Sequence, residues 1–267
     1  MSWKISLPMY NLSTELSDGY EALLEALLDL LRAAGWRGEV ELLREPSLPA
    51  LWQRPDLLFS QTCGYPYVSL LRERVQLLAT PCYAFAGCAG SDYSSVIVVR
   101  KGGGIGTLAE ARGQVAVAND VGSNSGMNVL RHAVAPLAEQ GRFFRQVRWS
   151  GSHVASLALL REGAADIAAI DCVSFGYLQQ TQPDSLAGLA VLQYSAAAPG
   201  LPMIAGAAVP EELVRLLREA LLRPQRRMAE ILSSLSITGF EQLGAVDYAR
   251  IEALAAEARA RGYAELA

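Results

Sequence analysis

The part of the sequence that most constrains the fold is an apolar run followed by a turn of small residues and a helical pattern. Residues 115–118 are apolar throughout, and the apolar residues of 127–134 recur at helical spacing. The small and polar residues of the turn are Gly122, Ser123, Asn124, Ser125 and Gly126. The first backbone N–H groups of a helix lack helical partners, and the helix dipole adds partial positive charge there. We therefore predict an anion-binding turn after a buried strand, with simple helix capping by the serines as the alternative.

Strand-like and helix-like patterns alternate along most of the chain. Short apolar or alternating segments predict strands at 3–7, 40–43, 57–59, 75–79, 94–99, 146–149, 166–171 and 189–194. Apolar residues at helical spacing predict helices near 20–31, 66–74, 154–160, 211–222 and 246–261. This alternation predicts a parallel α/β sheet, in which ligands bind beyond the carboxyl ends of the strands.

Polar residues follow several of these predicted strands. They are Tyr10, Ser60, Gln61 and Thr62 in the first half of the chain, and His153 and Asp171 in the second. Because each lies near the carboxyl end of a strand, these side chains are candidates for a ligand site. For His153 and Asp171 the alternative is a cap on the helix that follows.

Four glycines stand close together after the strand at 94–99. They are Gly102, Gly103, Gly104 and Gly106. Glycine loosens the backbone, so this run predicts a hinge between two lobes. The run is not a phosphate-binding P-loop, because no Gly-Lys pair followed by Ser or Thr is present.

Composition and charge limit the partners of the protein. The chain has 267 residues, a net charge of −4 and no block of Lys or Arg, which argues against nucleic-acid binding. No apolar run has the length of a membrane span. Two His and four Cys stand at no metal-ligand spacing, so neither a metal site nor a cofactor is expected. Any anion site must therefore be made locally, from backbone dipoles and hydroxyl groups.

The N-terminus and the cysteines bear on cellular location. The first residues show no secretory signal, so the chain as it stands is expected to be cytoplasmic; a periplasmic location is the alternative if a leader precedes it. Cys82 and Cys88 could pair in an oxidising compartment, and buried thiols are the alternative for both. In the cytoplasm all four cysteines are expected to be reduced.

Several motifs resemble those of the phosphonate/phosphate-type substrate-binding proteins of ABC transporters. They are Tyr93-Ser-Ser-Val-Ile-Val-Val99, Leu108-Ala-Glu-Ala-Arg-Gly113, Gly122-Ser-Asn-Ser-Gly126, Ser152-His153 and Gly163-Ala-Ala-Asp-Ile-Ala-Ala-Ile-Asp171. The resemblance covers most of the chain, and the serine-rich turn and the His–Asp pair are its most specific parts. The family turn usually carries Ser-Thr-Ser-Gly, so this chain has one hydroxyl fewer. Members of the family usually also carry a secretion signal.

The resemblance implies the type II, transferrin-like fold of the periplasmic binding proteins. In this α/β fold two lobes, joined by two crossing strands, hold the ligand in a cleft between them. The expected lobes are 1–100 together with 193–267, and 101–192. The implied ligand contacts are Tyr10, Ser60, Gln61, Thr62, Ser94 and Ser95 in the first lobe, and Ser123, Asn124, Ser125, Gly126, His153 and Asp171 in the second.

The implied function is the binding of a small oxyanion such as a phosphonate or phosphate, with closure of the two lobes around it. If the protein is exported, an ABC permease is the expected partner. Two other functions stay open. A cytoplasmic enzyme on the same fold, acting on a small organic acid or cofactor precursor, would use Asp171, His153 or Cys63, although no spacing pairs them. Iron binding would combine His153 and Asp171 with two tyrosines.

Overall fold

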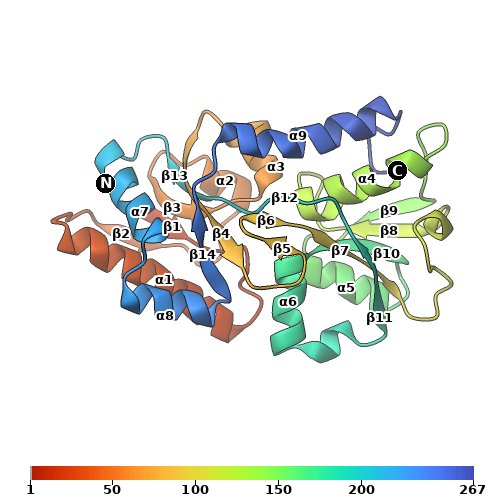
Figure 1. Ribbon diagram of the computed structural model, residues 1–267, viewed down its shortest axis with the longest axis horizontal. Coiled ribbons are helices and arrows are strands. Elements are labelled where there is room, and N and C mark those ends of the chain that lie inside the picture. Colours follow the sequence, from red (N-terminus) through yellow and green to blue (C-terminus); the bar gives the residue numbers. More distant parts are fainter. Residues whose placement is uncertain (1) are drawn as a thin grey trace. The chain divides into compact units, whose positions relative to one another are not determined.

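The chain folds into two compact units, and the computed structural model describes residues 2–267 (Figure 1). Unit 1 comprises the described residues up to Ala84, Ala89–Ser91 and Pro199–Tyr248. Unit 2 comprises Phe85–Cys88, Asp92–Ala198 and Ala249–Ala267. Each unit is built around a sheet of its own.

Unit 1 contains a six-stranded mixed sheet. Its strands lie in the order β14 (Ile237–Glu241), β4 (Val75–Tyr83), β13 (Met203–Gly206), β3 (Leu57–Gln61), β1 (Trp3–Ser6) and β2 (Val40–Leu42). β1 is parallel to β2 and β3, whereas β13 is antiparallel to β3 and β4, and β14 is antiparallel to β4. The prediction of a parallel sheet is therefore wrong for β4, because its neighbours β13 and β14 are both antiparallel to it. The sequence did not predict β13 and β14, which return from a distant part of the chain, and residue periodicity within a strand carries no information about its direction.

Amphipathic helices cover this sheet. α1 (Thr14–Ala33) packs against α7 (Glu211–Leu222) and α8 (Arg226–Ser234), and the last two also contact β14 (Figure 1). α1 begins at Ser13, whose Oγ accepts a hydrogen bond from the Leu16 N–H at 3.2 Å. Shorter helical pieces are α2 (Leu48–Trp52), α3 (Gly64–Pro66) and a π-helical turn at Tyr67–Leu71. Within residues 2–267, no helix combines the length and the apolar character needed to cross a membrane.

Unit 2 contains a five-stranded sheet. Its strands lie in the order β11 (Leu189–Tyr194), β7 (Ser95–Arg100), β10 (Ile167–Asp171), β8 (Val115–Ala118) and β9 (Gln146–Trp149). β8, β9 and β10 are parallel, as predicted, but the prediction of a parallel sheet is wrong for β7, which is antiparallel to β10 and β11. β8 and β10 are buried along their whole length. Their nearly continuous apolar sequences fit strands that are covered on both faces.

Three helices pack against the sheet of unit 2. α5 (His153–Arg161) contacts β7, β8 and β10, while α6 (Cys172–Thr181) contacts β7 and β10. α4 (Val129–Val134) continues the π-helical turn Asn124–Asn128 and contacts β10. The helix expected at 127–134 is therefore present, but it begins earlier as a wider turn. The segment that follows the glycine run forms only a short 3₁₀ helix, Ala109–Ala111.

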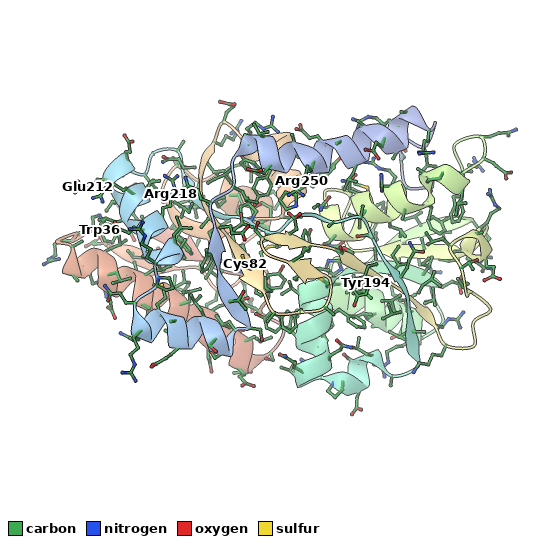
Figure 2. The ribbon with its side chains drawn as sticks, in the orientation of Figure 1. Trp36, Cys82, Tyr194, Glu212, Arg218 and Arg250 are labelled. Carbon is green, nitrogen blue, oxygen red and sulfur yellow. The ribbon has the colours of Figure 1, made fainter. Side chains whose placement is uncertain are left out.

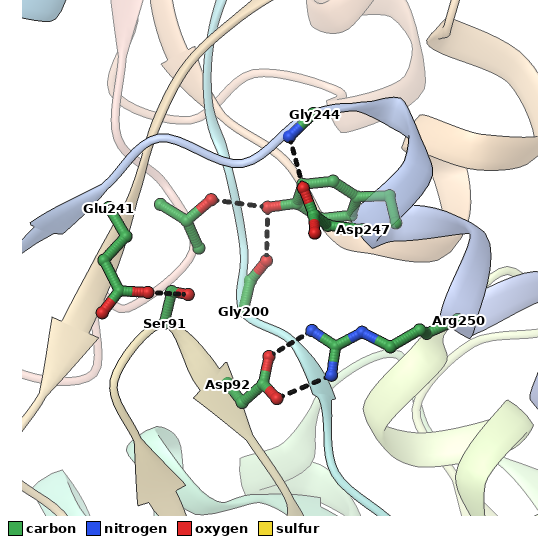
Figure 3. A network of polar contacts seen from close by, with 9 residues as sticks. Ser91, Asp92, Gly200, Glu241, Gly244, Asp247 and Arg250 are labelled. Carbon is green, nitrogen blue, oxygen red and sulfur yellow. Dashed lines mark hydrogen bonds and ion pairs between the residues drawn. The ribbon is translucent and has the colours of Figure 1, made fainter.

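Short strands lie where the chain passes from one unit to the other. β5 (Cys88–Ala89), β6 (Asp92–Tyr93) and β12 (Ala198–Pro199) form a small sheet in the order β12, β6, β5. The division at Tyr248 falls inside α9 (Ala245–Ala260), which is therefore a further passage that the sequence did not predict. Within unit 2, the guanidinium of Arg250 on α9 donates to both carboxylate oxygens of Asp92, at 2.5 and 2.7 Å (Figure 3).

The units divide the chain at other points than the expected 1–100, 101–192 and 193–267. β7 belongs to unit 2, because its backbone pairs with β10 and β11. Residues 249–267 also belong to unit 2. They are held there partly by the Arg131 guanidinium, which donates to the Ala264 carbonyl at 2.7 Å.

The glycine run does not connect the two units. Residues 102–106 lie inside unit 2, in an exposed turn that follows β7. Gly102 and Gly104 adopt φ angles of 71° and 81°, which are strained for other residues. The glycines therefore shape a surface turn, and the prediction of a hinge at this run is wrong.

A buried tyrosine ties three segments of unit 1 together. The Tyr248 hydroxyl lies 2.8 Å from Thr80 Oγ1 on β4 and donates to the Gly200 carbonyl at 2.9 Å (Figure 3). Its ring meets that of Tyr67 edge-on, with centroids 5.0 Å apart. Burial raises the pKa of Tyr248 well above its usual range, so the hydroxyl keeps its proton and can donate.

We expect Tyr248→Phe to lower the free energy of unfolding by about 1–3 kcal/mol, because it leaves the Gly200 carbonyl without its donor. Urea unfolding measures this change. The matched control is Tyr65→Phe, whose half-exposed side chain is expected to change stability by about 0.5 kcal/mol or less. Equal effects of the two substitutions would contradict a structural role of this hydroxyl.

Candidate functional site

The predicted ligand residues of unit 2 lie at one edge of its sheet. Because β8, β9 and β10 are parallel, the turn at 123–126, His153 and Asp171 all follow carboxyl ends of strands. β7 runs the other way, and Ser95 pairs with Asp171 in register. The start of β7 therefore reaches the same edge, and Ser94 and Ser95 belong here rather than in the first lobe as expected.

The serine-rich turn contains a helix cap and packs closely against the side chain of Asn119. Ser123 Oγ accepts a hydrogen bond from the Gly126 N–H at 2.9 Å and begins the π-helical turn. Capping was the alternative interpretation of this serine, and the structure contains it. The capping hydrogen bond uses only a lone pair of the Ser123 hydroxyl oxygen, so the hydroxyl hydrogen stays available to a ligand. A Cβ atom on Gly126 would lie 1.8 Å from Asn119 Oδ1, which explains the glycine.

Ser125 and His153 form a hydrogen-bonded pair from two different elements. Ser125 Oγ lies 2.9 Å from His153 Nε2; the Ser125 side chain is buried and that of His153 is half-buried. The other ring nitrogen, Nδ1, is buried and has no hydrogen-bond partner. Burial lowers the pKa of His153 from 6.5 to about 4, so the ring is neutral at pH 7 without a ligand. A cap on α5 was the alternative interpretation of His153, but Ser152 caps this helix, because its Oγ accepts from the Ala155 N–H at 3.1 Å.

Asp171 and Ser95 face each other across β10 and β7, and they differ in how their polar atoms are used. Asp171 is 2% exposed, and its Oδ1 accepts from the Val173 and Ser174 N–H groups at 2.7 and 3.0 Å. The capping alternative is therefore present at Asp171. Ser95 Oγ is buried without a hydrogen-bond partner. Ser94 contributes its backbone N–H, which donates to the Gly87 carbonyl at 2.8 Å.

A polar network behind the turn was not predicted from the sequence. Asn124 donates to the Tyr93 hydroxyl at 3.2 Å and accepts from Asn128 Nδ2 at 2.9 Å. Asn128 Oδ1 accepts in turn from Arg131 at 2.7 Å, and Arg131 also holds the Ala264 carbonyl. The amide of Asn124 therefore fixes the turn from behind. The spacing of four residues between the two asparagines was the only signal of this network in the sequence.

The predicted residues of unit 1 also lie at strand ends. β1 and β3 are parallel, so Ser60 and Gln61 end β3 on the same side as the segment after β1. Ser60 Oγ and Gln61 Oε1 are buried without a hydrogen-bond partner, while Gln61 Nε2 donates to the Leu201 carbonyl at 3.1 Å. Thr62 Oγ1 donates to the Cys63 carbonyl at 3.3 Å.

Tyr10 lies in an aromatic cluster of unit 1. Its ring stacks on Tyr20 with centroids 6.3 Å apart and meets Tyr83 edge-on at 5.5 Å. The hydroxyls of Tyr20 and Tyr83 lie 3.0 Å apart. Tyr10 is 2% exposed, so its main observed role is packing.

Buried side-chain atoms without a hydrogen-bond partner occur both among the predicted residues and elsewhere. Within residues 2–267 they include Ser60 Oγ, Gln61 Oε1, Ser95 Oγ, Asn119 Oδ1 and His153 Nδ1, as well as Nε of Arg100 and Arg131. Each such atom costs about 1–3 kcal/mol of stability, so a set of them at strand ends is expected where a ligand supplies the partner. Asn119 was not singled out from the sequence. In the same residues, no three His, Cys, Asp or Glu side chains are arranged to hold a metal ion.

A profile of the family described as "ABC transporter, phosphonate, periplasmic substrate-binding protein" matches residues 53–248. The chain belongs to this family. It is therefore a substrate-binding protein for phosphonate-like anions, as the sequence motifs implied. The family also implies a small ligand, a permease partner and a periplasmic location of the mature protein. A search of curated protein sequences finds no match.

Solved structures share the fold of this substrate-binding protein. PhnD1 of Prochlorococcus marinus in complex with methylphosphonate aligns with a TM-score of 0.80 and 16% identity, over 97% of this chain and 98% of that one. A binding protein component of a phosphonate ABC transporter from Pseudomonas aeruginosa gives 0.70 and 18%, over 98% and 97%. XAC2383 of Xanthomonas citri bound to ATP gives 0.72 and 16%, over 98% of each chain. These similarities confirm the type II periplasmic-binding-protein fold.

The lowered pKa of His153 predicts an acid-sensitive stability. Between pH 6.5 and about 4, the unfolded chain binds a proton at His153 that the folded chain does not. The free energy of unfolding therefore falls as the pH is lowered through this range, by up to about 1.4 kcal/mol per pH unit. We expect His153→Gln to remove this slope in urea unfolding at pH 5 to 6.5, whereas His132→Gln should retain it. An unchanged slope in His153→Gln would show that another group causes the pH dependence.

Proposed function

We propose that this substrate-binding protein holds the oxygen atoms of a phosphonate or phosphate at the strand ends of unit 2. The observation that carries the proposal is the buried Ser95 Oγ and His153 Nδ1, which have no hydrogen-bond partner and lie at the edge that also carries the serine-rich turn. A tetrahedral oxyanion would satisfy several of these groups at once. Without it, these side-chain atoms have no hydrogen-bond partner within the protein.

The donors of this site are neutral groups. Ser95, Ser123 and Ser125 would each present a hydroxyl hydrogen to the anion. When His153 carries its proton on Nε2, the ring donates to Ser125 Oγ and leaves the serine hydrogen free for the ligand. A bound anion favours the charged imidazolium and so raises the pKa of His153, after which Nδ1 also becomes a donor.

Acceptors at the strand ends favour a ligand that still carries a proton. Asp171 is a buried carboxylate, and an unprotonated anion next to it would be repelled. Gln61 Oε1 in unit 1 is likewise an acceptor without a donor. A phosphonate monoanion has one P–OH group that can donate to such an oxygen, whereas a sulfonate has no proton at neutral pH. We infer that the acceptors select phosphonate and phosphate over sulfonate.

The residues of unit 1 differ in their fitness for ligand binding. Ser60 and Gln61 have unpartnered buried atoms, so we propose them as the ligand contacts of unit 1. The hydroxyl of Thr62 already donates to a carbonyl oxygen, and Tyr10 is packed in the aromatic cluster, so both are weaker candidates. We further propose that the mature protein acts in the periplasm and delivers its ligand to an ABC permease, as is typical of its family.

Ser95→Ala separates a ligand contact from a structural role. Removing an unpartnered buried hydroxyl should leave the stability of the free protein unchanged or raise it. The same change should weaken methylphosphonate binding roughly tenfold to a hundredfold, because one charge-assisted hydrogen bond is lost. Calorimetric titration and thermal unfolding of the same samples measure the two effects.

Two further variants complete this experiment. Ser152→Ala removes the cap of α5, so it should lower stability by about 1 kcal/mol and leave the affinity unchanged. Ser60→Ala should behave like Ser95→Ala if unit 1 contacts the ligand. Wild-type affinity in Ser95→Ala, or no binding of methylphosphonate or phosphate by the wild type, would refute the proposed site.

The choice between phosphonate and sulfonate tests the acceptors. At a pH where the phosphonate keeps one proton, we expect methylphosphonate to bind at least about tenfold more tightly than methanesulfonate, which is similar in shape. In Asp171→Asn the side chain can still cap α6 but no longer repels an unprotonated anion. This substitution should therefore reduce the ratio of the affinities for methylphosphonate and methanesulfonate. Asp184→Asn, an exposed acid of unit 2, is the control. Equal affinities in the wild type would show that Asp171 does not select the ligand.

A catalytic role receives less support from the same residues. Ser125 and His153 resemble a nucleophile and its general base, since they lie 2.9 Å apart. However, His153 Nδ1 has no carboxylate to orient the ring, and a pKa of about 4 makes the imidazole a poor base at neutral pH. The pair is therefore better suited to binding an anion than to activating a serine.

A further inference from the structure

Two cysteines that are distant in sequence lie side by side in unit 2. Cys88 Sγ lies 3.4 Å from Cys172 Sγ, and the residues are 84 positions apart. Cys88 is in β5, and Cys172 is the first residue of α6. Sequence spacing had suggested Cys82 as the partner of Cys88, but Cys82 is a buried residue of β4 in unit 1 (Figure 2). The sulfur neighbour of Cys88 is therefore a residue that spacing could not identify.

The segment around Cys88 is closely packed against α6. The Phe85 ring meets the Tyr177 ring edge-on with centroids 4.9 Å apart. A Cβ atom on Gly176 would lie 2.3 Å from Cδ1 of Phe85. Gly87 has a φ angle of 96°, and a Cβ there would lie 3.0 Å from the Cβ of Cys172. These contacts hold the two sulfur atoms near each other, so only a small movement separates the present distance from the roughly 2.05 Å of a disulfide bond.

The two thiols have different environments. Cys88 is half-exposed, whereas Cys172 is 1% exposed. A hydrogen bond from the Cys172 thiol lowers the pKa of Cys88, and the same bond together with burial raises the pKa of Cys172. The accessible sulfur is thus the better nucleophile, and the buried sulfur lies next to it.

We propose that Cys88 and Cys172 are a thiol–disulfide exchange site, which forms a reversible disulfide on reaction with a small external disulfide such as oxidised glutathione. The Cys88 thiol gives its proton to solvent and the thiolate attacks one sulfur of the oxidant, so that the S–S bond breaks, one thiolate leaves and a mixed disulfide remains on Cys88. The Cys172 thiol then gives its proton to solvent and attacks the Cys88 sulfur, which breaks the mixed disulfide and releases the second thiolate. Both released thiolates take up a proton from solvent. The two cysteines are oxidised by two electrons and the external disulfide is reduced to two thiols.

The Cys88–Cys172 disulfide would have an effect separate from anion binding, because it would fix a segment that lies between two stretches of unit 1. Residues 85–88 belong to unit 2, whereas the stretches on both sides of them, up to Ala84 and from Ala89, belong to unit 1. A disulfide would fix this segment covalently to the first residue of α6. It would also restrict the unfolded chain by closing a long loop. Oxidation would persist in a disulfide-permitting compartment and be reversed in a reducing one.

The test exposes the native full-length protein to oxidised glutathione, blocks the remaining thiols with an alkylating reagent after unfolding, and maps the peptides by mass spectrometry. We expect one linked peptide that contains Cys88 and Cys172, while Cys63 and Cys82 are alkylated. Dithiothreitol should return all four thiols. Four alkylated cysteines after oxidation, or a link that involves Cys63 or Cys82, would overturn the proposal.

Single substitutions resolve the order of the two steps. In Cys172→Ser the second thiol is missing, so Cys88 should keep a glutathione adduct. In Cys88→Ser the buried Cys172 should react at least about tenfold more slowly than Cys88 does in the wild type. Cys82→Ser is the matched control and should form the link as the wild type does. Rapid glutathione capture by Cys172 in Cys88→Ser would contradict the proposed order.

Discussion

The site in unit 2 depends on the parallel register of β8, β9 and β10. Their carboxyl ends place the serine-rich turn, His153 and Asp171 at one edge, and the antiparallel β7 adds Ser95 opposite Asp171. The strands themselves are apolar and buried, which gives the edge a rigid support. Only a well-packed support can hold polar atoms such as Ser95 Oγ in place without a partner, because each one lowers the stability of the folded chain.

Capping and ligand binding are not alternatives at this edge. Ser123 and Asp171 both accept hydrogen bonds from the backbone of the helical turns that they begin. These bonds use oxygen lone pairs and fix the side chains in direction. The hydroxyl hydrogen of Ser123 takes no part in the cap, and the capping hydrogen bond restricts the directions in which it can donate. A serine that caps a turn is thus a more ordered donor than a serine on a flexible loop, since less side-chain entropy is lost on binding.

The sequence predicted those features that depend on local pattern. The apolar runs at β8, β10 and β11 and the helical spacing of α7 identify their elements within a few residues, and the spacing of α1 identifies that helix without its first turns. Features that depend on distant contacts were missed. β13 joins the sheet of unit 1 from more than a hundred residues away, and nothing in its four residues indicates a direction. The glycine run was predicted to be a hinge because composition indicates backbone flexibility. Composition does not indicate which strands pair with β7, and that pairing places the run inside unit 2. For the same reason Cys172, Asn119 and the network behind Asn124 came only from the structure.

The absence of Lys and Arg from the proposed contacts has a consequence for how the anion is held and released. The proposed contacts in unit 2 are the hydroxyls of serines and the imidazole of His153, which is neutral until the anion binds, and Asp171 is a buried acid at the same edge. Attraction to the ligand is therefore short-ranged and arises from fixed dipoles, which salt screens far less than it screens exposed charges. A guanidinium in their place would attract any anion of suitable size, sulfonate included. Hydroxyl donors combined with the buried acid Asp171 instead give an affinity that depends on where the protons of the ligand lie.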